Sequence, residues 1–383
     1  MNLVSKDISD DFPKSEKIYL NNASVSLMPN QSIQAMDDFL ITYNSIGPDS
    51  KDSATFVEEK LRNVRKIISK IISCQPDEIV LTQSTSDGIN IVANGLTFEK
   101  NSNMIIRAMT HEHHANLYPW LKLKEKTTIR NLPIDNNGFF QLDQLESKID
   151  KDTKLVALSH ALYNTGSILP VAKVGKLLED KIPFFIDSAQ TIGCIDEVDV
   201  SKIKCNFMSF NGSKWLCGPM GTGLFYCSRS SSELLEPTTI GGESAIIYEN
   251  EKLAYKELPD KFQTGFRNYV GIAGLEASAK YLQEFGMKNI REKNKHLSNL
   301  FREELSKMPK VELYGPEDPN ERTSIISFNI DGFSSEEIVE RLEKQNIILA
   351  EREIMEKKIV RVSPHFFNTE SEMLQVIDAI KKL

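Results

Sequence analysis

The chain has 383 residues, of which 40% are hydrophobic and 26% are charged, and its formal net charge is −8 at pH 7. This length is enough for two domains with buried cores. Acidic and basic residues are interspersed, and the excess of acid argues against nucleic acid or an anionic membrane as a partner.

The five cysteines are scattered along the chain, and none belongs to a CxxC pair. An odd number of cysteines without a pattern indicates reduced thiols rather than a disulfide framework. The first residues, MNLVSKDISDDF, contain no basic and then apolar signal segment, and no apolar run is long enough to span a bilayer. We therefore expect a cytoplasmic protein without a membrane partner.

The first strong helical pattern covers residues 56–73, where Val57, Leu61, Val64, Ile68 and Ile71 share one face. Short, continuously apolar runs follow, separated by helical patterns. They predict strands at 78–82, 104–109, 127–132, 154–160, 183–188, 207–210 and 223–227. Because such runs are typical of strands covered on both faces, we predict an α/β fold with a mostly parallel seven-stranded sheet and helices on both sides.

The pattern changes from about residue 270. Helices are predicted at 270–285, 288–308 and 334–345 and from Thr369, and they flank the apolar runs VELY, SIISFNI, IILA and KIVRV. This mixture indicates a smaller C-terminal α+β domain. We predict an N-terminal arm (1–16) that packs with the small domain, a large cofactor-binding domain (17–265) and the small domain (266–383).

Polar residues follow the predicted strands at their carboxyl ends, where open α/β sheets bind ligands. They are Thr85 and Ser86 in QSTSDGIN, His113 in THEHHAN, Tyr163 and Asn164 in ALYNTG, Asp187 and Gln190 in IDSAQ, and Asn211, Ser213 and Lys214 in FNGSK. Taken singly, each has an ordinary explanation, such as a helix cap, a turn or a solvated lysine. Together they fit pyridoxal phosphate, which needs a lysine for a Schiff base, a carboxylate at its ring nitrogen and donors for its phosphate.

Six segments carry a resemblance to a known family. They are YLNNAS (19–24), TQSTSDGIN (82–90), EHHAN (112–116), IDSAQ (186–190), FNGSKWLCGPMGTG (210–223) and RVSPHFFNT (361–369). The chain resembles the class V aminotransferase superfamily of pyridoxal-phosphate enzymes, the fold type I group that contains cysteine desulfurases, C–S lyases and isopenicillin N epimerase-like proteins. The resemblance implies the fold of that group and an enzyme that acts on a small amino acid.

The resemblance also implies roles for single residues. Lys214 would form the Schiff base and move the α-proton, Asp187 would pair with the ring nitrogen, and Gln190 would bind the ring hydroxyl. His113 would stack on the ring and take part in proton transfer. The other implied cofactor-binding residues are Thr85, Ser86, Asn164, Asn211 and Ser213, and the implied substrate-binding residues are Arg361, through its planar fork, and Asn22.

The family resemblance further implies a homodimer with shared active sites, in which residues 263–268 reach the cofactor of the other subunit. Several positions depart from the desulfurase pattern. Asn211 and Ser213 replace the Ser and His of the usual SGHK, and Gly265-Phe266 replaces a Gly-Thr pair, which leaves Thr264 as another phosphate donor. Tyr163 stands where an Asn is usual, so whether Tyr163 or Asn164 faces the cofactor stays open.

The largest departure concerns sulfur. A desulfurase needs a thiolate that attacks the substrate sulfur, and residues 348–362, where that cysteine belongs, contain none. This favours β-elimination with C–S bond cleavage, as in a cysteine or cystine lyase. Desulfuration through another cysteine such as Cys217, transamination and epimerisation stay open.

Two readings from other classes fit less well. His111 and His113 have the first spacing of an HxHxDH zinc motif, but Ala115 and Asn116 stand where its Asp and last His ligands belong, so we expect no metal. A non-catalytic scaffold would not need Lys214, Asp187 and His113 together.

Overall fold

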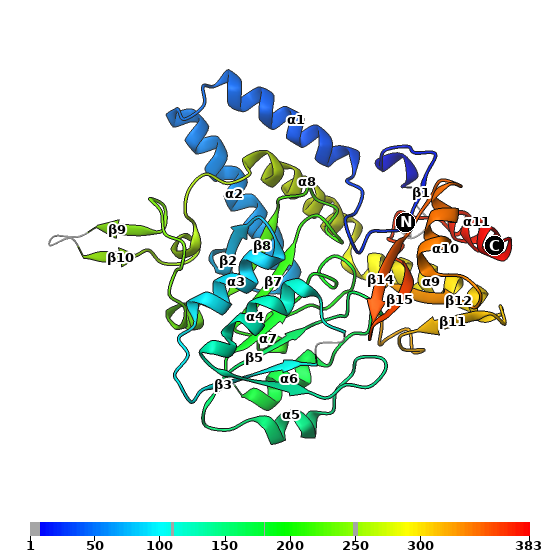
Figure 1. Cartoon of the computed structure of the whole chain (residues 1–383). Helices are drawn as coiled ribbons and strands as arrows, with labels where there is room; N and C mark the ends of the chain where they lie inside the picture. Colours follow the sequence, from blue (N-terminus) through cyan, green and yellow to red (C-terminus); the bar gives the residue numbers. More distant parts are fainter. Residues whose placement is uncertain (1–7, 109–110, 180, 248–251) are drawn as a thin grey trace.

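Two sheets organise the chain in the computed structural model, which describes residues 8–108, 111–179, 181–247 and 252–383 (Figure 1). The larger has seven strands in the order β2-β8-β7-β6-β5-β3-β4. Its strands are β2 (Ile79–Thr82), β3 (Asn103–Arg107), β4 (Thr128–Leu132), β5 (Thr153–Ser159), β6 (Phe184–Asp187), β7 (Phe207–Asn211) and β8 (Gly223–Cys227). Only β8 runs antiparallel to its neighbours. The predicted α/β fold with a mostly parallel seven-stranded sheet is confirmed. The strand predicted at 104–109 is β3, which ends at Arg107, and residue 109 lies outside the described part.

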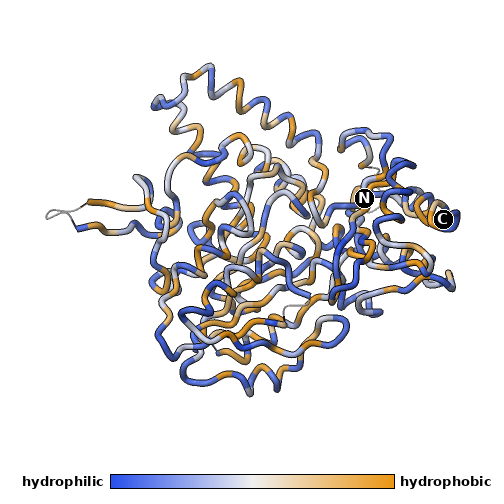
Figure 2. The backbone as a smooth tube through the Cα atoms, in the orientation of Figure 1, coloured by the Kyte–Doolittle hydropathy of each residue, from blue (hydrophilic) through white to orange (hydrophobic). Residues whose placement is uncertain are grey.

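Both faces of this sheet are covered, which explains why its strands are apolar throughout. Successive side chains of a strand point to opposite faces. In β6, Phe184 and Ile186 belong to one buried cluster, with α2, α6, α7 and α8, whereas Phe185 belongs to another, with α3 and α4. Figure 2 shows the hydrophobic residues concentrated in these central strands.

Eleven α-helices lie in the described residues. They are α1 (Asn30–Ser45), α2 (Lys51–Ile72), α3 (Thr85–Gly95), α4 (Tyr118–Lys122), α5 (Leu142–Lys148), α6 (Val171–Leu178), α7 (Val200–Ile203), α8 (Tyr269–Phe285), α9 (Met287–Ser306), α10 (Ser335–Glu343) and α11 (Glu370–Lys381). In α2 the buried face holds Val57, Leu61, Val64 and Ile68 as predicted, but Ile72 completes it and Ile71 is half-buried. None of the described helices has the length and apolar character needed to cross a membrane.

The smaller sheet is antiparallel and has the order β11-β12-β15-β14. Its strands are β11 (Val311–Tyr314), β12 (Ile326–Ile330), β14 (Ala350–Ile354) and β15 (Lys357–Val362). The apolar run IILA, predicted as one strand, is divided between β13 (Ile347–Ile348), which pairs with β1 (Ile18–Tyr19), and the start of β14. A short hairpin, β9 (Ala245–Ile247) and β10 (Leu253–Tyr255), projects from the opposite end of the molecule (Figure 1).

The N-terminal segment lies against the C-terminal part of the chain. Phe12 contacts the rings of Tyr281, Phe366 and Phe367 with centroid distances of 6.0, 6.0 and 4.2 Å. Of the predicted arm at 1–16, residues 1–7 lie outside the described part.

Candidate active site

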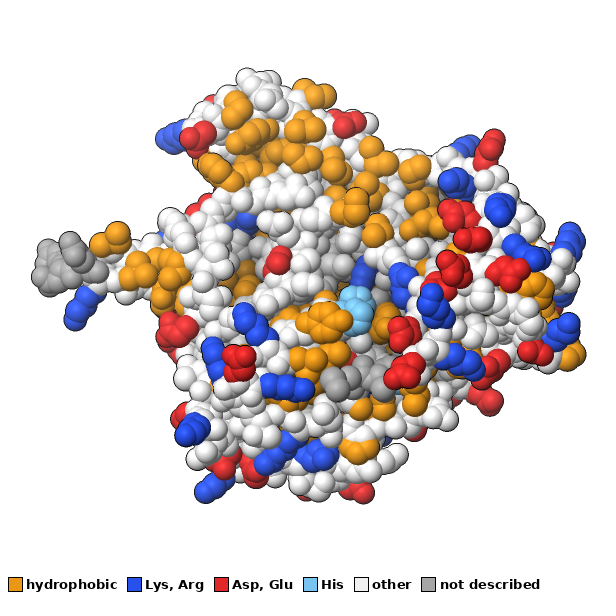
Figure 3. All heavy atoms as spheres, viewed as in Figure 1, with side chains coloured by type: hydrophobic (Ala, Val, Ile, Leu, Met, Phe, Trp, Pro, Cys, Tyr) orange, Lys and Arg blue, Asp and Glu red, His pale blue; other side chains and the backbone are white. Residues whose placement is uncertain are grey.

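One pocket lies at the carboxyl ends of β5, β6 and β7, close to the N-terminus of α3. Its lining residues are Ser84, Thr85, Ser86, His113, Ala115, Ser159, Ala161, Tyr163, Asp187, Ala189, Gln190, Asn211 and Lys214. The structure thus brings together eight of the residues that the sequence nominates. Figure 3 shows a histidine and several lysine or arginine side chains around a hollow between the large sheet and the C-terminal strands.

The N-terminus of α3 forms one wall of the pocket. The Ser84 side chain caps the helix by accepting from the N–H of Asp87, so the N–H groups of Thr85 and Ser86, in the first turn, have no partner within the helix. The buried hydroxyl of Thr85 and the side-chain oxygen of Asn211 have no hydrogen-bond partner in the described structure. Unpaired N–H groups and a free hydroxyl at a helix N-terminus are suited to a phosphate group.

Strand β8 reaches this helix end closely because residue 223 is a glycine. A Cβ atom at Gly223 would lie 2.3 Å from the backbone nitrogen of Ser84. The close approach fixes the α3 N-terminus beside β7 and β8, and so beside the loop that carries Lys214.

Asp187 and Gln190 lie on the floor of the pocket after β6. The Asp187 carboxylate accepts from the N–H of Ala189 at 2.9 Å, and burial raises its pKa to about 6. The Gln190 amide donates to the Ala23 carbonyl at 3.0 Å and accepts from the Trp215 indole at 2.8 Å, which leaves one amide proton free. An acidic group and a fixed amide donor are therefore available side by side.

Lys214 follows β7 by three residues and turns its amine into the pocket. Burial lowers the pKa of Lys214 to about 8, although the nearby Asp187 carboxylate acts in the opposite direction. The neutral amine is consequently far more abundant near neutral pH than for an exposed lysine.

His113 and Tyr163 lie on the other side of the pocket. Their rings meet edge to face, with centroids 5.0 Å apart at an interplanar angle of 81°. The His113 Nδ1 accepts from the N–H of Ala115 at 3.2 Å, and burial together with the Lys214 charge lowers the pKa of His113 to about 4. The imidazole is therefore uncharged at neutral pH. An uncharged ring is suited to stack on the aromatic ring of a cofactor.

A buried ion pair that the sequence did not nominate supports His113. Glu112 accepts from Arg107 at 3.2 Å, from the Ser159 hydroxyl at 2.7 Å and from the backbone N–H of His113 at 2.9 Å. Both charged side chains are almost fully buried. The EHHAN segment (112–116) could have indicated this contact, because a glutamate directly before a histidine can accept a hydrogen bond from the backbone N–H of that histidine.

Four predicted residues do not line the pocket. The Asn164 amide donates to the Glu353 carbonyl at 2.9 Å, so Tyr163, and not Asn164, presents its side chain to the pocket. Asn22 is fully buried and bonds to the Ser363 carbonyl at 2.9 Å, and Ser213 is also buried outside the lining. Arg361 lies behind Tyr163 and donates to its carbonyl at 2.8 Å.

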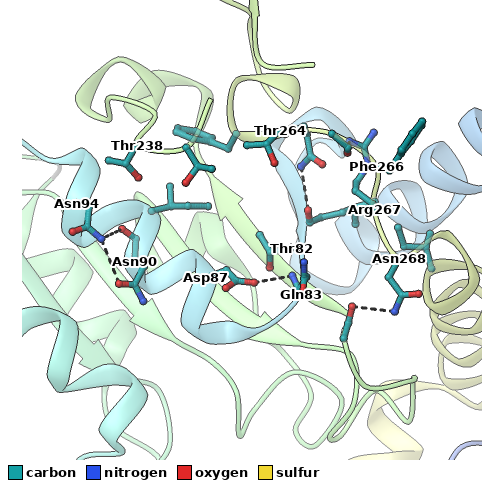
Figure 4. A pocket seen from close by; sticks show the side chains of 18 residues that line it. Thr82, Gln83, Asp87, Asn90, Asn94, Thr238, Thr264, Phe266, Arg267 and Asn268 are labelled. Carbon is teal, nitrogen blue, oxygen red and sulfur yellow. Dashed lines mark hydrogen bonds between the residues drawn. The ribbon is translucent and has the colours of Figure 1, made fainter. Parts of the chain in front are cut away.

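Residues 263–268 line a second cavity rather than this pocket (Figure 4). Thr264 and Phe266 lie opposite Thr82 and Asp87 there, and the Gln263 amide donates to the Leu81 carbonyl at 3.2 Å. Phe266 is 82% exposed. Whether this segment serves the cofactor of another subunit stays a prediction.

The zinc alternative rests on His111 and His113. Within the described residues, neither ring nitrogen of the buried His111 has a hydrogen-bond partner, and burial lowers the pKa of His111 to about 4. Within the described part of the chain, no three His, Cys, Asp or Glu side chains are grouped to hold a metal ion. The pocket instead fits the phosphate, ring nitrogen, ring hydroxyl and aldehyde of pyridoxal phosphate, through the unpaired Thr85 hydroxyl, Asp187, Gln190 and Lys214.

Comparison with known proteins places these features in context. The family model described as aminotransferase class-V matches residues 18–376. A probable cysteine desulfurase from Methanothermobacter thermautotrophicus is 29% identical and covers 99% of this chain and 98% of its own length.

Solved structures agree with the fold. The apo structure of a cysteine desulfurase from Thermococcus onnurineus NA1 superposes with a TM-score of 0.91 at 28% identity, covering 99% of this chain and 97% of the other. Two structures of C-DES, each 22% identical, have TM-scores of 0.89 and 0.87 and cover 98% and 95% of this chain and 98% and 97% of theirs. One is a lysine-to-alanine mutant with glycine covalently linked to its pyridoxal-phosphate cofactor, and the other is described as a cystine C–S lyase in complex with cysteine persulfide.

Proposed function

The chain belongs to the class-V aminotransferase family, and we propose that it is a pyridoxal-phosphate enzyme that cleaves a C–S bond of a cystine-like amino acid by β-elimination. Pyridoxal phosphate is the cofactor of the C-DES structure that shares this fold. Lys214, Asp187, Gln190 and the α3 N-terminus, with Thr85, are the groups that hold it in this proposal. Bound pyridoxal phosphate supplies an electron sink for the substrate α-carbon.

The observation that carries the choice of β-elimination is the form of the β14–β15 hairpin. Its turn consists of Met355 and Glu356 alone, both with positive φ (47° and 70°), as two-residue hairpin turns require. Neither this turn nor its two strands contains a cysteine. A hairpin this short offers no mobile thiol to take sulfur from a substrate.

The five cysteines of the chain all lie within the described residues, and none is a ready nucleophile. Burial raises the pKa of Cys74 to about 12, of Cys194 to about 11 and of Cys217 to about 12. Burial also raises the pKa of Cys205 and Cys227. Since the thiolate is the reactive form, sulfur transfer to this chain is disfavoured, whereas β-elimination needs no protein thiol.

Two arginines of the β14–β15 hairpin, which lie behind Tyr163 and do not themselves line the pocket, suit an amino acid with two acidic ends. Arg361 is 1% exposed, and its guanidinium bonds to the Tyr163 carbonyl, the Asn21 side chain and the Ser24 hydroxyl. Arg352, on the neighbouring strand, also donates to Ser24. Arg361 would bind the α-carboxylate, and Arg352 is available for the distal carboxylate of cystine.

Lys214 and His113 have different roles in the proposed reaction. The Lys214 amine takes the proton from the α-carbon, because it is the basic group that reaches into the pocket and its lowered pKa keeps part of it neutral. The neutral His113, held by Ala115 and Glu112, fixes one wall against which the reacting groups stack. Burial of the pocket excludes water and so limits loss of the proton to solvent.

We also propose a homodimer in a reducing, cytoplasmic environment. Phe266 is exposed beside the second cavity, which suits contact with another subunit. All five cysteines are free, as is usual in reducing compartments.

Product analysis tests the reaction. The cofactor-loaded protein is incubated separately with L-cystine and with L-cysteine, and the organic product is identified. Pyruvate with ammonia and a persulfide from cystine is the expected result. Alanine would contradict β-elimination and indicate desulfuration, and a keto acid that retains sulfur would indicate transamination.

A further inference from the structure

Tyr163 is held at the pocket from both ends. Its ring stands edge-on to His113 at 5.0 Å, and its backbone carbonyl accepts from Arg361 at 2.8 Å. The residue lies four positions after the end of β5 at Ser159, and the two residues before it, Ala161 and Leu162, are buried. The phenol consequently has a defined position beside the lining residue Lys214 rather than a free range of rotamers.

The phenol hydroxyl keeps its proton available. In the described structure its hydrogen-bond contact is the Glu353 carbonyl, at 3.5 Å. The same carbonyl already accepts from the Asn164 amide at 2.9 Å. A contact of 3.5 Å contributes little, so a substrate atom can replace it at small cost.

The charges around Tyr163 suit a group that gives up a proton and takes it back. Burial, with Glu353 and Glu112, raises the pKa of Tyr163, so the phenol stays protonated at neutral pH. Arg352 and Arg361 act in the opposite direction and would stabilise a phenolate once formed.

Other proton donors in the pocket are less suitable for this step. His113 is neutral, and because its Nδ1 accepts from the N–H of Ala115, its proton lies on Nε2, where a neutral imidazole is a much weaker acid than a phenol. Lys214 is engaged with the α-proton in the proposed reaction, and the Asp187 carboxylate lies on the floor of the pocket, where it is assigned to the cofactor ring. Among the described residues, the phenol is a donor without another assigned task on the side of the β14–β15 hairpin, where its hydroxyl lies 3.5 Å from the Glu353 carbonyl.

We propose that Tyr163 donates a proton to the sulfur atom that leaves the substrate. The inference rests on the proposed β-elimination. As the C–S bond breaks, its electron pair goes to sulfur, the Tyr163 hydroxyl proton moves to that sulfur, and the phenolate lies beside Arg352 and Arg361 until it takes a proton from water. Such assistance matters most when the leaving group is a poor one.

A series of substrates with different leaving groups tests this role in the cofactor-loaded Tyr163→Phe variant. With S-ethyl-L-cysteine, a poor leaving group, we expect kcat for pyruvate formation to fall about 10²-fold, the usual size of general-acid assistance. With S-(4-nitrophenyl)-L-cysteine, whose thiolate leaves without help, the fall should be small. An equal loss on both substrates would overturn the inference and assign Tyr163 to positioning only.

Two further measurements complete the design. Cofactor uptake, followed by the absorbance and circular dichroism of the bound cofactor, should match the wild type, and a loss of uptake would overturn the inference. Tyr118→Phe is the matched control, because Tyr118 is 57% exposed and stacks on His114 outside the pocket, so its substrate profile should not change. If the wild type forms no pyruvate from any substrate, the proposed function itself fails, a result distinct from a uniform loss in Tyr163→Phe.

Discussion

Arg352 and Arg361 donate to a single hydroxyl, that of Ser24, and neither has a carboxylate within ion-pair distance in the described structure. The pairing of β14 with β15 explains their proximity. Ala350 lies opposite Arg361, and Arg352 is two residues further along the same face, so the two arginines are diagonal neighbours. Burial is the main cause that lowers the pKa of Arg361, and the positive charge of Arg352 lowers it further. One buried and one half-buried cation without an anion are costly unless a ligand supplies the negative charge.

Replacement of Arg352 by alanine should separate substrates by their charge. For cystine, which carries a distal carboxylate, we expect kcat/KM to fall by about 10-fold to 100-fold, the equivalent of one charged hydrogen bond. For S-ethyl-L-cysteine, which lacks that carboxylate, kcat/KM should change little. Steady-state pyruvate formation measures both.

The Arg361→Ala variant is the comparison, since Arg361 is assigned to the α-carboxylate that both substrates have. It should reduce kcat/KM for cystine and S-ethyl-L-cysteine alike. If Arg352→Ala also reduced both equally, the distal-carboxylate role of Arg352 would be wrong.

The lowered pKa of Lys214 predicts a pH dependence for cofactor attachment. Only the neutral amine attacks an aldehyde, and burial lowers the pKa of Lys214 to about 8. The rate at which cofactor-free protein takes up pyridoxal phosphate should therefore rise as pH increases towards 8 and level off above it. A rise that continues to the usual range of an exposed lysine, near pH 10, would contradict the buried amine. Lys214→Ala should lose covalent attachment at every pH.

Asp187 predicts a second pH effect, with a lower midpoint. Burial raises its pKa to about 6 in the cofactor-free protein, so the carboxylate becomes neutral as pH falls below that value. A neutral acid no longer favours a protonated ring nitrogen, so the affinity for pyridoxal phosphate should decrease from pH 7 to pH 5. Asp187→Asn should have low affinity at both pH values and lose the change between them. Equilibrium titration of cofactor absorbance provides the measurement, and a pH-independent affinity in the wild type would refute the role.

The sequence predicts the large sheet well because its strands are buried on both faces and are therefore continuously apolar. It also predicts that Asp187, Gln190 and Lys214 line one pocket, since Asp187 ends β6 and the other two come three residues after a parallel strand, which places them at the same edge of the sheet. The choice between Tyr163 and Asn164 is not predictable in this way. It depends on the carbonyl of Glu353, a residue 189 positions further along the chain, which accepts the Asn164 amide.

Similar long-range contacts explain the remaining differences. The run IILA is divided because Ile347 and Ile348 pair with β1, near the N-terminus, and not with β15. Glu112 is a buried acid whose partner, Arg107, lies on the preceding strand, and composition alone does not distinguish such a pair from a solvated one. Local patterns therefore predict strands and strand ends, whereas pairings between distant segments decide which side chain enters the site.

Cys217 is the thiol nearest to Lys214 in sequence, and its replacement tests whether any cysteine of this chain accepts sulfur. Cys217 is fully buried, and its sulfur lies 3.5 Å from the Ser26 hydroxyl. Cys217→Ala keeps the Cβ atom at the positive φ of 54° and leaves only a small cavity, so we expect the free energy of unfolding to fall by about 1 kcal/mol. Because β-elimination needs no thiol, kcat for pyruvate formation from cystine should stay the same as in the wild type.

Cys194→Ala is a suitable control for Cys217→Ala, because Cys194 is equally buried and does not line the pocket. Both variants should lose similar stability, measured by denaturant unfolding, and neither should lose activity. If Cys217→Ala alone abolished turnover while binding the cofactor normally, Cys217 would have a chemical role. The buried thiol would then have to become accessible during turnover, and desulfuration would replace β-elimination as the reaction that the site supports.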